Sequence, residues 1–307
     1  MTSKFNKIIR VLKDPSLLFL WLLRRYASCV KDDEYYVRML YFLCMKKKLN
    51  LNQPSTFNEK LQWLKLYDQH DEYTDLVDKA KVKSYVAELI GEKYIIPTLG
   101  VWDHFEDIDF DLLPEQFVMK CTHDSGSTVV CKDKKNLNVV KVRKKINKAL
   151  KCDIFVKTRE YPYKMVKPKI IVEKYMNDKS QTDDLLDYKI MVFNGEVRCV
   201  FVCSNRNHPK GLCVDFYDLD WNHLPFQRHY RNNPLPIDKP SQMEKMISLS
   251  KQLASRLNAP FVRIDFYQIG EQPYFGEITF YPGNGMEEFT PEEWDYRLGE
   301  WLELPQK

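Results

Sequence analysis

Apolar residues recur at helical spacing through the first third of the chain. The pattern covers residues 33–48 and, after a break, residues 75–89. Ser55 or Thr56 is placed to cap a further helix between these two, because an amide or acidic side chain follows three residues after each. This part of the sequence therefore predicts a helical region.

From about residue 112 onward, short apolar runs between turn residues replace the helical pattern. Residues 116–120 and 129–131 are two such runs, and the polar loop 123–128 joins them, which predicts a strand-loop-strand hairpin. A basic helix and a buried strand follow, at residues 139–151 and 169–173. The basic helix carries no aromatic residue placed for stacking, so nucleic-acid binding is not favoured.

Asn194-Gly195 gives the clearest local signal in the sequence. It separates two β-rich runs, residues 188–193 and 196–203, and an Asn-Gly pair at such a position is typical of a tight hairpin. The remaining elements are a helix and two strands, at residues 241–257, 261–267 and 274–280. Together these patterns predict an α+β fold preceded by a helical N-terminal region.

The composition of the 307-residue chain is that of a folded protein. Hydrophobic residues make up 44% and aromatic residues 13%, and only 10 residues are Gly, which excludes disordered and linker-rich classes. None of the eight cysteines forms a CxxC pair, so reduced thiols in a cytosol fit best. Zinc binding by Cys199, Cys203 and Cys213 with His208 is disfavoured, because the first two share one strand face as small core residues do.

Basic residues are concentrated near the N-terminus. Residues 1–30 contain six of them and a single acid, Asp14, and the apolar run 17–23 lies within this segment. Seven residues are far fewer than the roughly 20 that span a bilayer, and Arg24-Arg25 closes the run where a signal peptide would be cleaved. We expect a cytoplasmic protein whose N-terminal amphipathic helix either packs on its own domain or associates peripherally with the inner face of the membrane.

Two neighbouring strands near the C-terminus carry the polar residues best suited to bind a metal ion and a phosphoryl group. Arg263 and Asp265 point to one face of their strand, and Glu277 and Thr279 share a face of the next. Mg²⁺ prefers one or two carboxylates completed by phosphate and water, and a nearby arginine stabilises charge on a transferred phosphoryl group. Taken alone, the same residues also fit a solvated salt-bridge face of an antiparallel sheet.

Lys120 ends a predicted strand and precedes a loop that contains Ser125, Gly126 and Ser127. A lysine beside a short Ser/Gly loop suits phosphate binding, because the loop offers backbone N–H groups above the phosphates. An ordinary edge-strand lysine gives the same local pattern.

Several motifs together resemble those of the ATP-grasp ligases, including the D-alanine-D-alanine ligases. The order and spacing of Glu173–Met176, Arg263-Ile-Asp265 and Gly-Glu277-Ile-Thr279 are similar to theirs. The chain more closely resembles the TupA-like ATP-grasp proteins of teichuronopeptide and capsular polysaccharide biosynthesis. This resemblance rests on residues 56–64, 78–82, 117–120 and 275–282 and extends over about residues 35–300.

The resemblance implies a nucleotide held between two α+β lobes. Lys120 and Lys189 would lie near the phosphates of ATP. The adenine would contact the hinge between the lobes, formed by Glu173, Lys174, Tyr175 and Met176. The ribose would contact Asp183 or Asp184. The implied domains are an N-terminal helical segment, a helical region before the ATP-grasp fold, and the two lobes, at residues 1–50, 51–112, 113–186 and 187–307.

By the same resemblance, Asp265 and Glu277 bind Mg²⁺, and Glu277 is able to bridge two ions. Arg263 faces the acyl-phosphate, with Lys189 beside it. Thr279 stands where the related ligases usually carry Asn, and a hydroxyl is a weaker metal ligand than an amide carbonyl. The second Mg²⁺ would then be held less tightly or through water.

The function that follows is an ATP-dependent carboxylate–amine ligase. The implied substrates are an acidic glycan or lipid-linked saccharide with a uronic acid, and an amino acid or other amine. Two alternatives stay open from the sequence: an ATP-dependent sugar kinase that stops after phosphorylation, and a sugar-transferring or non-catalytic component of polysaccharide assembly.

Overall fold

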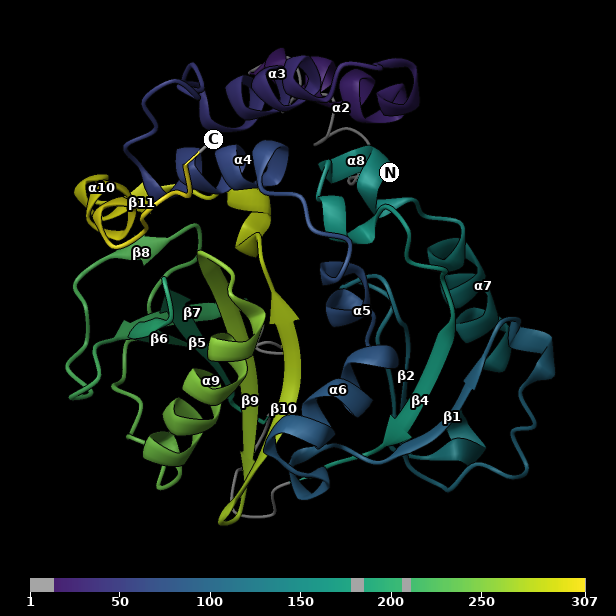
Figure 1. Ribbon diagram of the computed structural model, residues 1–307. Coiled ribbons are helices and arrows are strands. Elements are labelled where there is room, and N and C mark those ends of the chain that lie inside the picture. The colour runs from purple at the N-terminus through teal and green to yellow at the C-terminus, as the bar shows by residue number, and fades with distance from the viewer. Residues whose placement is uncertain (1–13, 178–184, 206–210, 307) are drawn as a thin grey trace.

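The computed structural model describes residues 14–177, 185–205 and 211–306, which form two large antiparallel sheets and a small two-stranded one, with helices around and between the two large sheets (Figure 1). The first sheet has the strand order β1-β4-β2-β3. Its strands are β1 (Thr98–Trp102), β2 (Phe117–Cys121), β3 (Val129–Cys131) and β4 (Ile170–Lys174). Helix α7 (Val139–Leu150) buries Val142 and Ile146 against the face of this sheet that carries Phe117 and Met119. We call this sheet and α7 lobe 1.

The second sheet has the strand order β10-β9-β5-β6-β7. Its strands are β5 (Asp187–Phe193), β6 (Glu196–Ser204), β7 (Cys213–Tyr217), β9 (Phe261–Ile269) and β10 (Gln272–Thr279). Asn194 and Gly195 both have positive φ, at 47° and 84°, so the predicted tight hairpin between β5 and β6 is confirmed. Helix α9 (Met243–Leu257) covers one face of this sheet with Met246, Leu249 and Leu253. We call this sheet and α9 lobe 2.

The prediction of one continuous helix over residues 75–89 is wrong, because two helices occupy this region: α5 (Tyr73–Val77) and α6 (Lys81–Ile90). Asp78 separates them with an extended backbone, and its buried carboxylate accepts hydrogen bonds from the N–H groups of Ala80 and Lys81. A short acidic side chain at such a position competes with helix continuation by bonding the local backbone. In Figure 1 both helices lie between the lobes.

Helix α4 (Phe57–Tyr67) begins with a capping box. The Thr56 hydroxyl accepts from the Glu59 N–H, and the Glu59 carboxylate accepts from the Thr56 N–H, so the second of the two predicted caps is the one formed. Asn58 instead donates to Asp295 of α10 (Glu293–Glu300), which ties α4 to the C-terminal helix. This attachment places α4 beside the end of β10.

The N-terminal helices α2 (Ser16–Arg25) and α3 (Asp33–Met45) lie across one end of the molecule, next to α4 and α8 (Ile154–Thr158) (Figure 1). Among the described residues, no helix combines the length and the apolar character needed to cross a membrane. The remaining elements are β8 (Gln227–Arg228), β11 (Phe289–Thr290) and the 3-10 helices η1 (Ala27–Cys29), η2 (Glu92–Tyr94), η3 (Phe105–Asp107), η4 (Lys134–Asn136), η5 (Tyr161–Tyr163) and η6 (Pro282–Gly285). The domain boundaries expected from the sequence stay predictions.

Candidate active site

Strand register gathers charged side chains on the face of the lobe 2 sheet that α9 leaves uncovered. Lys189 of β5 pairs with Asp265 of β9, and Arg263 of β9 pairs with Thr279 of β10. Paired residues in an antiparallel sheet point to the same face. A register shift between Phe275 and Ile278 interrupts the β9–β10 ladder next to Glu277.

Arg263 joins the two carboxylates on this face. Its Nε lies 2.7 Å from Asp265 Oδ1, and its Nη2 lies 2.8 Å from Asp265 Oδ2 and 2.6 Å from Glu277 Oε1. Lys189 pairs with Asp265 as well, and its Nζ lies 2.7 Å from Asp187 Oδ2. One guanidinium nitrogen therefore holds two carboxylates from neighbouring strands within reach of each other.

The buried cations keep this cluster ionised. Although burial opposes the charge of Glu277, Arg263 and Lys79 hold the pKa of its carboxyl far below the usual range. Burial raises the pKa of Asp265 to about 6 against the opposing effects of Arg263 and Lys189, so this carboxyl is mainly ionised at neutral pH. Such a cluster presents anionic oxygen atoms to a cation.

Lobe 1 supplies lysines to the opposite wall. Glu173 of β4 is 4% exposed and binds Lys120 of β2 at 2.6 Å and Lys83 of α6 at 2.5 Å. Lys120 and Lys79 also lie close enough to Glu277 to lower the pKa of its carboxyl. Lys120 of lobe 1 and Lys79 of the α5–α6 segment thus lie near the Glu277 carboxylate of lobe 2.

Two hydrogen bonds of the Ser127 hydroxyl hold the loop between β2 and β3 together. The hydroxyl accepts from the Cys121 N–H at 2.7 Å and donates to Asp124, and the side chain is buried. Ser125 and Gly126 are exposed at the loop tip. Lys79 Nζ donates to the Asp124 carbonyl at 2.6 Å, which links the loop to the break between α5 and α6. The Ser127 hydroxyl is therefore engaged within the loop, whereas Ser125 and Gly126 are open to a ligand.

Helix α4 holds the turn that follows β10. Lys65 is fully buried, and its Nζ lies 2.9 Å from the Asn284 carbonyl and 2.6 Å from Asn284 Oδ1. Gln62 Nε2 donates to the Asn284 carbonyl at 2.9 Å and to the Gly285 carbonyl at 2.7 Å. Sequence reasoning missed this contact, although Gln62 lies in a motif that carried the family resemblance. The contact fixes the chain just beyond Thr279.

Glu160 adds an ionisable group that the sequence did not single out. Burial raises the pKa of its carboxyl to about 7, with Lys65 and Arg263 acting in the opposite direction. Tyr163, on the same segment, has its pKa raised first by burial and then by Glu160 and Glu277. The segment 160–163 therefore lies within electrostatic reach of the Arg263 cluster.

The structure brings together most of the residues predicted for the phosphate and metal end of the site. Lys120 and Lys189 face Glu277 from two lobes, and Thr279 Oγ1 donates to Glu277 Oε1 at 3.3 Å. Lys174 is exposed at the end of β4. Tyr175 and Met176 are half-buried after it, and Asp183 and Asp184 lie outside the described residues. The adenine and ribose contacts stay predictions.

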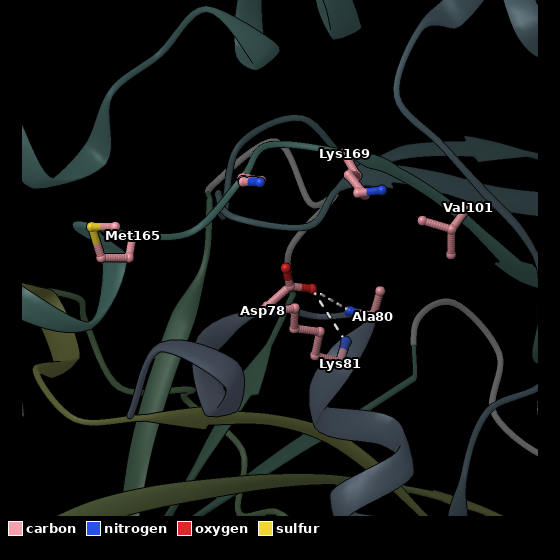
Figure 2. A pocket seen from close by; sticks show the side chains of 7 residues that line it. Asp78, Ala80, Lys81, Val101, Met165 and Lys169 are labelled. Atoms are coloured by element: carbon pink, nitrogen blue, oxygen red, sulfur yellow. Dashed lines mark hydrogen bonds between the residues drawn. The ribbon is translucent and has the colours of Figure 1, made fainter. Parts of the chain in front are cut away.

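A pocket of about 520 Å³ opens beside this wall of lobe 1 (Figure 2). Lys81, Lys167 and Lys169 line it, and Asp78 lies at its base with hydrogen bonds to the start of α6. Lys79, directly after Asp78, is the residue that reaches toward Glu277. Three lysines and one aspartate therefore line the pocket, which adjoins the Lys79 side of the candidate site.

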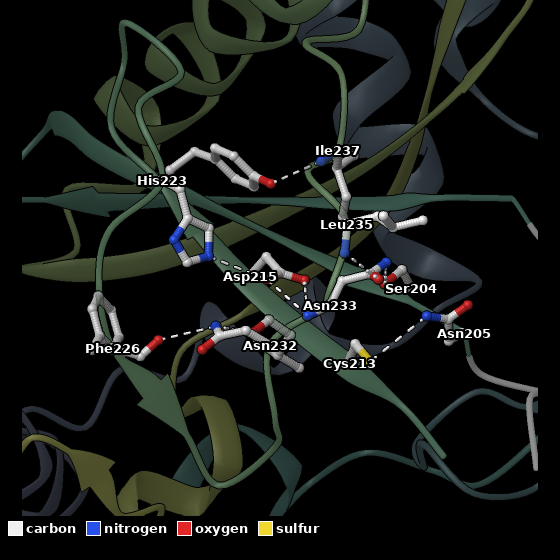
Figure 3. A network of polar contacts seen from close by, with 12 residues as sticks. Ser204, Asn205, Cys213, Asp215, His223, Phe226, Asn232, Asn233, Leu235 and Ile237 are labelled. Carbon is white, nitrogen blue, oxygen red and sulfur yellow. Dashed lines mark hydrogen bonds and ion pairs between the residues drawn. The ribbon is translucent and has the colours of Figure 1, made fainter. Parts of the chain in front are cut away.

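Cys213, one of the cysteines considered as a zinc ligand, lies in a network of polar contacts on β7. Cys213 Sγ accepts from Asn205 Nδ2 at 3.6 Å, next to a network in which Asn233 N–H donates to Asp215 and His223 Nε2 lies 3.2 Å from Asp215 Oδ1 (Figure 3). These contacts tie β7 to the segment that follows it. His208 lies outside the described residues.

The donor set fits Mg²⁺ together with a nucleotide better than it fits a metal held by protein alone. Within the described ranges, no group of three His, Cys, Asp or Glu side chains is able to hold a metal ion. Mg²⁺ bound with phosphates needs only one or two carboxylates from the protein. Asp265 Oδ2 and Glu277 Oε1 both accept from Arg263 Nη2, so one carboxylate from each of two neighbouring strands lies within reach of the other.

Comparison with known proteins agrees with this arrangement at the level of the family. The model of the family described as TupA-like ATPgrasp matches residues 59–303. No curated protein matches the chain. The motif resemblance predicted from the sequence is therefore confirmed.

Solved structures similar to this chain are remote. A D-alanine-D-alanine ligase from Bacillus anthracis in complex with ATP has 13% identity and a TM-score of 0.40, over 67% of this chain and 55% of its own. An L-amino acid ligase from Bacillus licheniformis has 12% identity and a TM-score of 0.42, over 74% of this chain and 49% of its own. The chain thus spans about half the length of these proteins. Because the family match covers most of its length, the protein belongs to the TupA-like ATP-grasp family.

Proposed function

We propose that the protein is an ATP-dependent carboxylate–amine ligase that forms an amide. The observation that carries the proposal is the position of Arg263, whose Nη2 binds both Asp265 and Glu277 on the side that Lys79 and Lys120 approach. This arrangement suits transfer of a phosphoryl group to a carboxylate, because cations surround the place where negative charge develops. Lys120 and Lys79 lie on the side where the nucleotide phosphates would enter.

Each residue of the cluster has a separate part in the proposed reaction. Asp265 and Glu277 would hold Mg²⁺, which supplies charge neutralisation to the phosphates when it is bound. A carboxylate oxygen of the acceptor attacks the γ-phosphorus of ATP, the bond to ADP breaks, and an acyl-phosphate forms. Arg263 would bind the oxygens of this group, and Lys189 would orient Asp265, with which it pairs from the neighbouring strand. The amine then attacks the acyl carbon, phosphate leaves, and the amine loses a proton.

We further propose that the carboxylate belongs to a uronic acid in a surface polysaccharide or its lipid-linked precursor, and that the amine is an amino acid or a related compound. The pocket lined by Lys81, Lys167 and Lys169 supports an acidic acceptor through its cationic lining, in which Lys81 pairs with Asp75 and Lys169 with Asp103. Charged glycans carry several carboxylates, so a basic approach to the site favours them.

The experiment is an activity assay on the purified chain with Mg²⁺, ATP, uronic-acid oligosaccharides and a set of amino acids. ADP release and the mass of the glycan product are measured with and without the amine. The proposal expects ADP formation that needs both substrates, and a product whose mass equals glycan plus amine minus water.

Two other outcomes contradict the ligase proposal in different ways. ADP formation without amine, with a stable gain of phosphate on the glycan, would indicate a kinase. No ATP consumption with any acceptor, by a chain that still binds ATP, would refute catalysis on these substrates. Glu244→Gln, on the exposed side of α9, is the control for Glu277→Gln, which is expected to lose ADP formation.

A further inference from the structure

Helix α2 exposes a stripe of large apolar side chains. Leu18 is 45% exposed, Phe19 and Trp21 are both 59% exposed, and Leu22 is 36% exposed, and none of the ten residues of α2 is buried. Single exposed apolar residues are ordinary on protein surfaces, whereas a group of them on neighbouring turns marks a contact surface. The stripe is therefore a candidate binding surface.

The opposite side of α2 already has a packing partner. Leu20 and Leu23 are partly buried against Ala27, Tyr36 and Leu40, the small core between α2 and α3. The helix is thus fixed to the protein through one side and presents the other outward. In Figure 1, α2 and α3 form the outer layer at one end of the molecule, away from both sheets.

The charges around the stripe identify the occupant. Arg24 and Arg25 are exposed at the end of α2, and the only nearby acid before it, Asp14, is paired with Lys46. The sequence that precedes the helix adds four more basic residues and no acid: Lys4, Lys7, Arg10 and Lys13. Aromatic and leucine side chains beside arginines are typical of helices that lie in the interface of an anionic bilayer.

We propose that α2 binds the surface of an anionic lipid bilayer, with Phe19 and Trp21 inserted at the headgroup level and Arg24 and Arg25 against lipid phosphates. A second copy of the chain is a less suitable occupant, because α2 carries no acidic residue that could meet Arg24 and Arg25 of the other copy. The lipid surface satisfies the apolar and the cationic groups at the same time. This proposal is independent of the reaction at the interlobe site.

Contacts behind α2 connect this surface to the rest of the protein. Arg159 Nη2 donates to the carbonyls of Ala27 and Val30 at 2.9 and 2.8 Å, directly after the α2 segment. Arg159 precedes Glu160, which lies within electrostatic reach of Arg263. A chain bound to lipid through α2 would hold the interlobe site at a fixed position relative to the membrane surface.

The test is sedimentation of the full chain with vesicles of phosphatidylcholine alone and of phosphatidylcholine mixed with phosphatidylglycerol. The wild type is expected to bind the anionic vesicles and to release them as salt is raised. The double variant Phe19→Ser/Trp21→Ser should bind them at least ~10-fold more weakly, and Arg24→Gln/Arg25→Gln should lose the preference for anionic lipid. Leu112→Ser, at an apolar residue that is 83% exposed elsewhere, is the matched control and should bind as the wild type does.

Circular dichroism and size-exclusion chromatography of each variant accompany the assay. Absence of wild-type binding to anionic vesicles would overturn the proposal. A wild-type dimer that dissociates in Phe19→Ser/Trp21→Ser, without lipid binding, would overturn it in favour of a second copy as the occupant. Equal binding by the wild type and both double variants would also overturn it.

Discussion

Replacement of Arg263 by lysine keeps the positive charge of the cluster and removes its geometry. Arg263 makes three charged hydrogen bonds, two to Asp265 and one to Glu277. A single ammonium group is unable to reproduce a planar fork that binds one carboxylate through two nitrogens and also reaches another. We therefore expect Arg263→Lys to lose about two of the three contacts.

The expected magnitude follows from the burial of these groups. Hydrogen bonds to charged groups contribute roughly 1.5–3 kcal/mol each, and water replaces part of the loss because Glu277 is one-third exposed. The free energy of unfolding should fall by about 2–4 kcal/mol, somewhat less than the roughly 3–5 kcal/mol that breaking a buried ion pair costs, because one contact and the charge remain. ATP turnover should fall by about 10²–10³-fold, as when a preorganised charge is removed from a transition state.

Chemical denaturation and the ADP-release assay measure the two effects separately. Arg256→Lys, at an exposed arginine of α9, is the control and should change the free energy of unfolding by less than about 0.5 kcal/mol. Turnover and stability of Arg263→Lys both equal to those of the wild type would refute the inference that the guanidinium fork organises the two carboxylates.

Two further predictions concern the contact between α4 and the turn after β10. Gly285→Ala would place a Cβ 2.4 Å from Gln62 Nε2. It should lower the free energy of unfolding by about 1–3 kcal/mol more than Gly270→Ala, the control, where φ is similarly positive and an added Cβ would have nothing within 4 Å. Equal losses of stability for the two variants in chemical denaturation would contradict the predicted clash. Burial lowers the pKa of Lys65 to about 8 from its ordinary 10.5, so the unfolded chain binds more protons than the folded chain between these pH values. The free energy of unfolding of the wild type, relative to that of Lys65→Met, should therefore rise with pH between about 8 and 10.5. Urea unfolding of both proteins at the two ends of this range measures the difference, and a difference that stays constant would contradict the prediction.

Local patterns in the sequence predict the elements of lobe 2 well. The hairpin at Asn194-Gly195 and the two strands that carry Arg263 and Glu277 depend on turn chemistry and alternation, which are readable over a few residues. Alternation also places Asp265 beside Arg263 on one face. The charged face of the sheet was therefore available from the sequence.

Contacts between distant segments were not available in the same way. Periodicity alone joined α5 and α6 into one helix and hid the break at Asp78, so the approach of Lys79 to the Glu277 side was not predicted. Lys65 is a charged residue within a helical pattern, and only packing against Asn284 buries it. Hydrophobic pattern specifies which side of a helix is inside, but not which other segment it meets.

We propose that Asp265 and Glu277 form the Mg²⁺ side of an ATP site. Isothermal titration of ATP into the wild type, with Mg²⁺ and with a chelator, and into Asp265→Asn/Glu277→Gln tests it most directly. Mg²⁺ is expected to tighten ATP binding to the wild type by at least ~10-fold, and the double variant is expected to lose this dependence. A double variant that folds and keeps the full effect of Mg²⁺ on ATP affinity would contradict it.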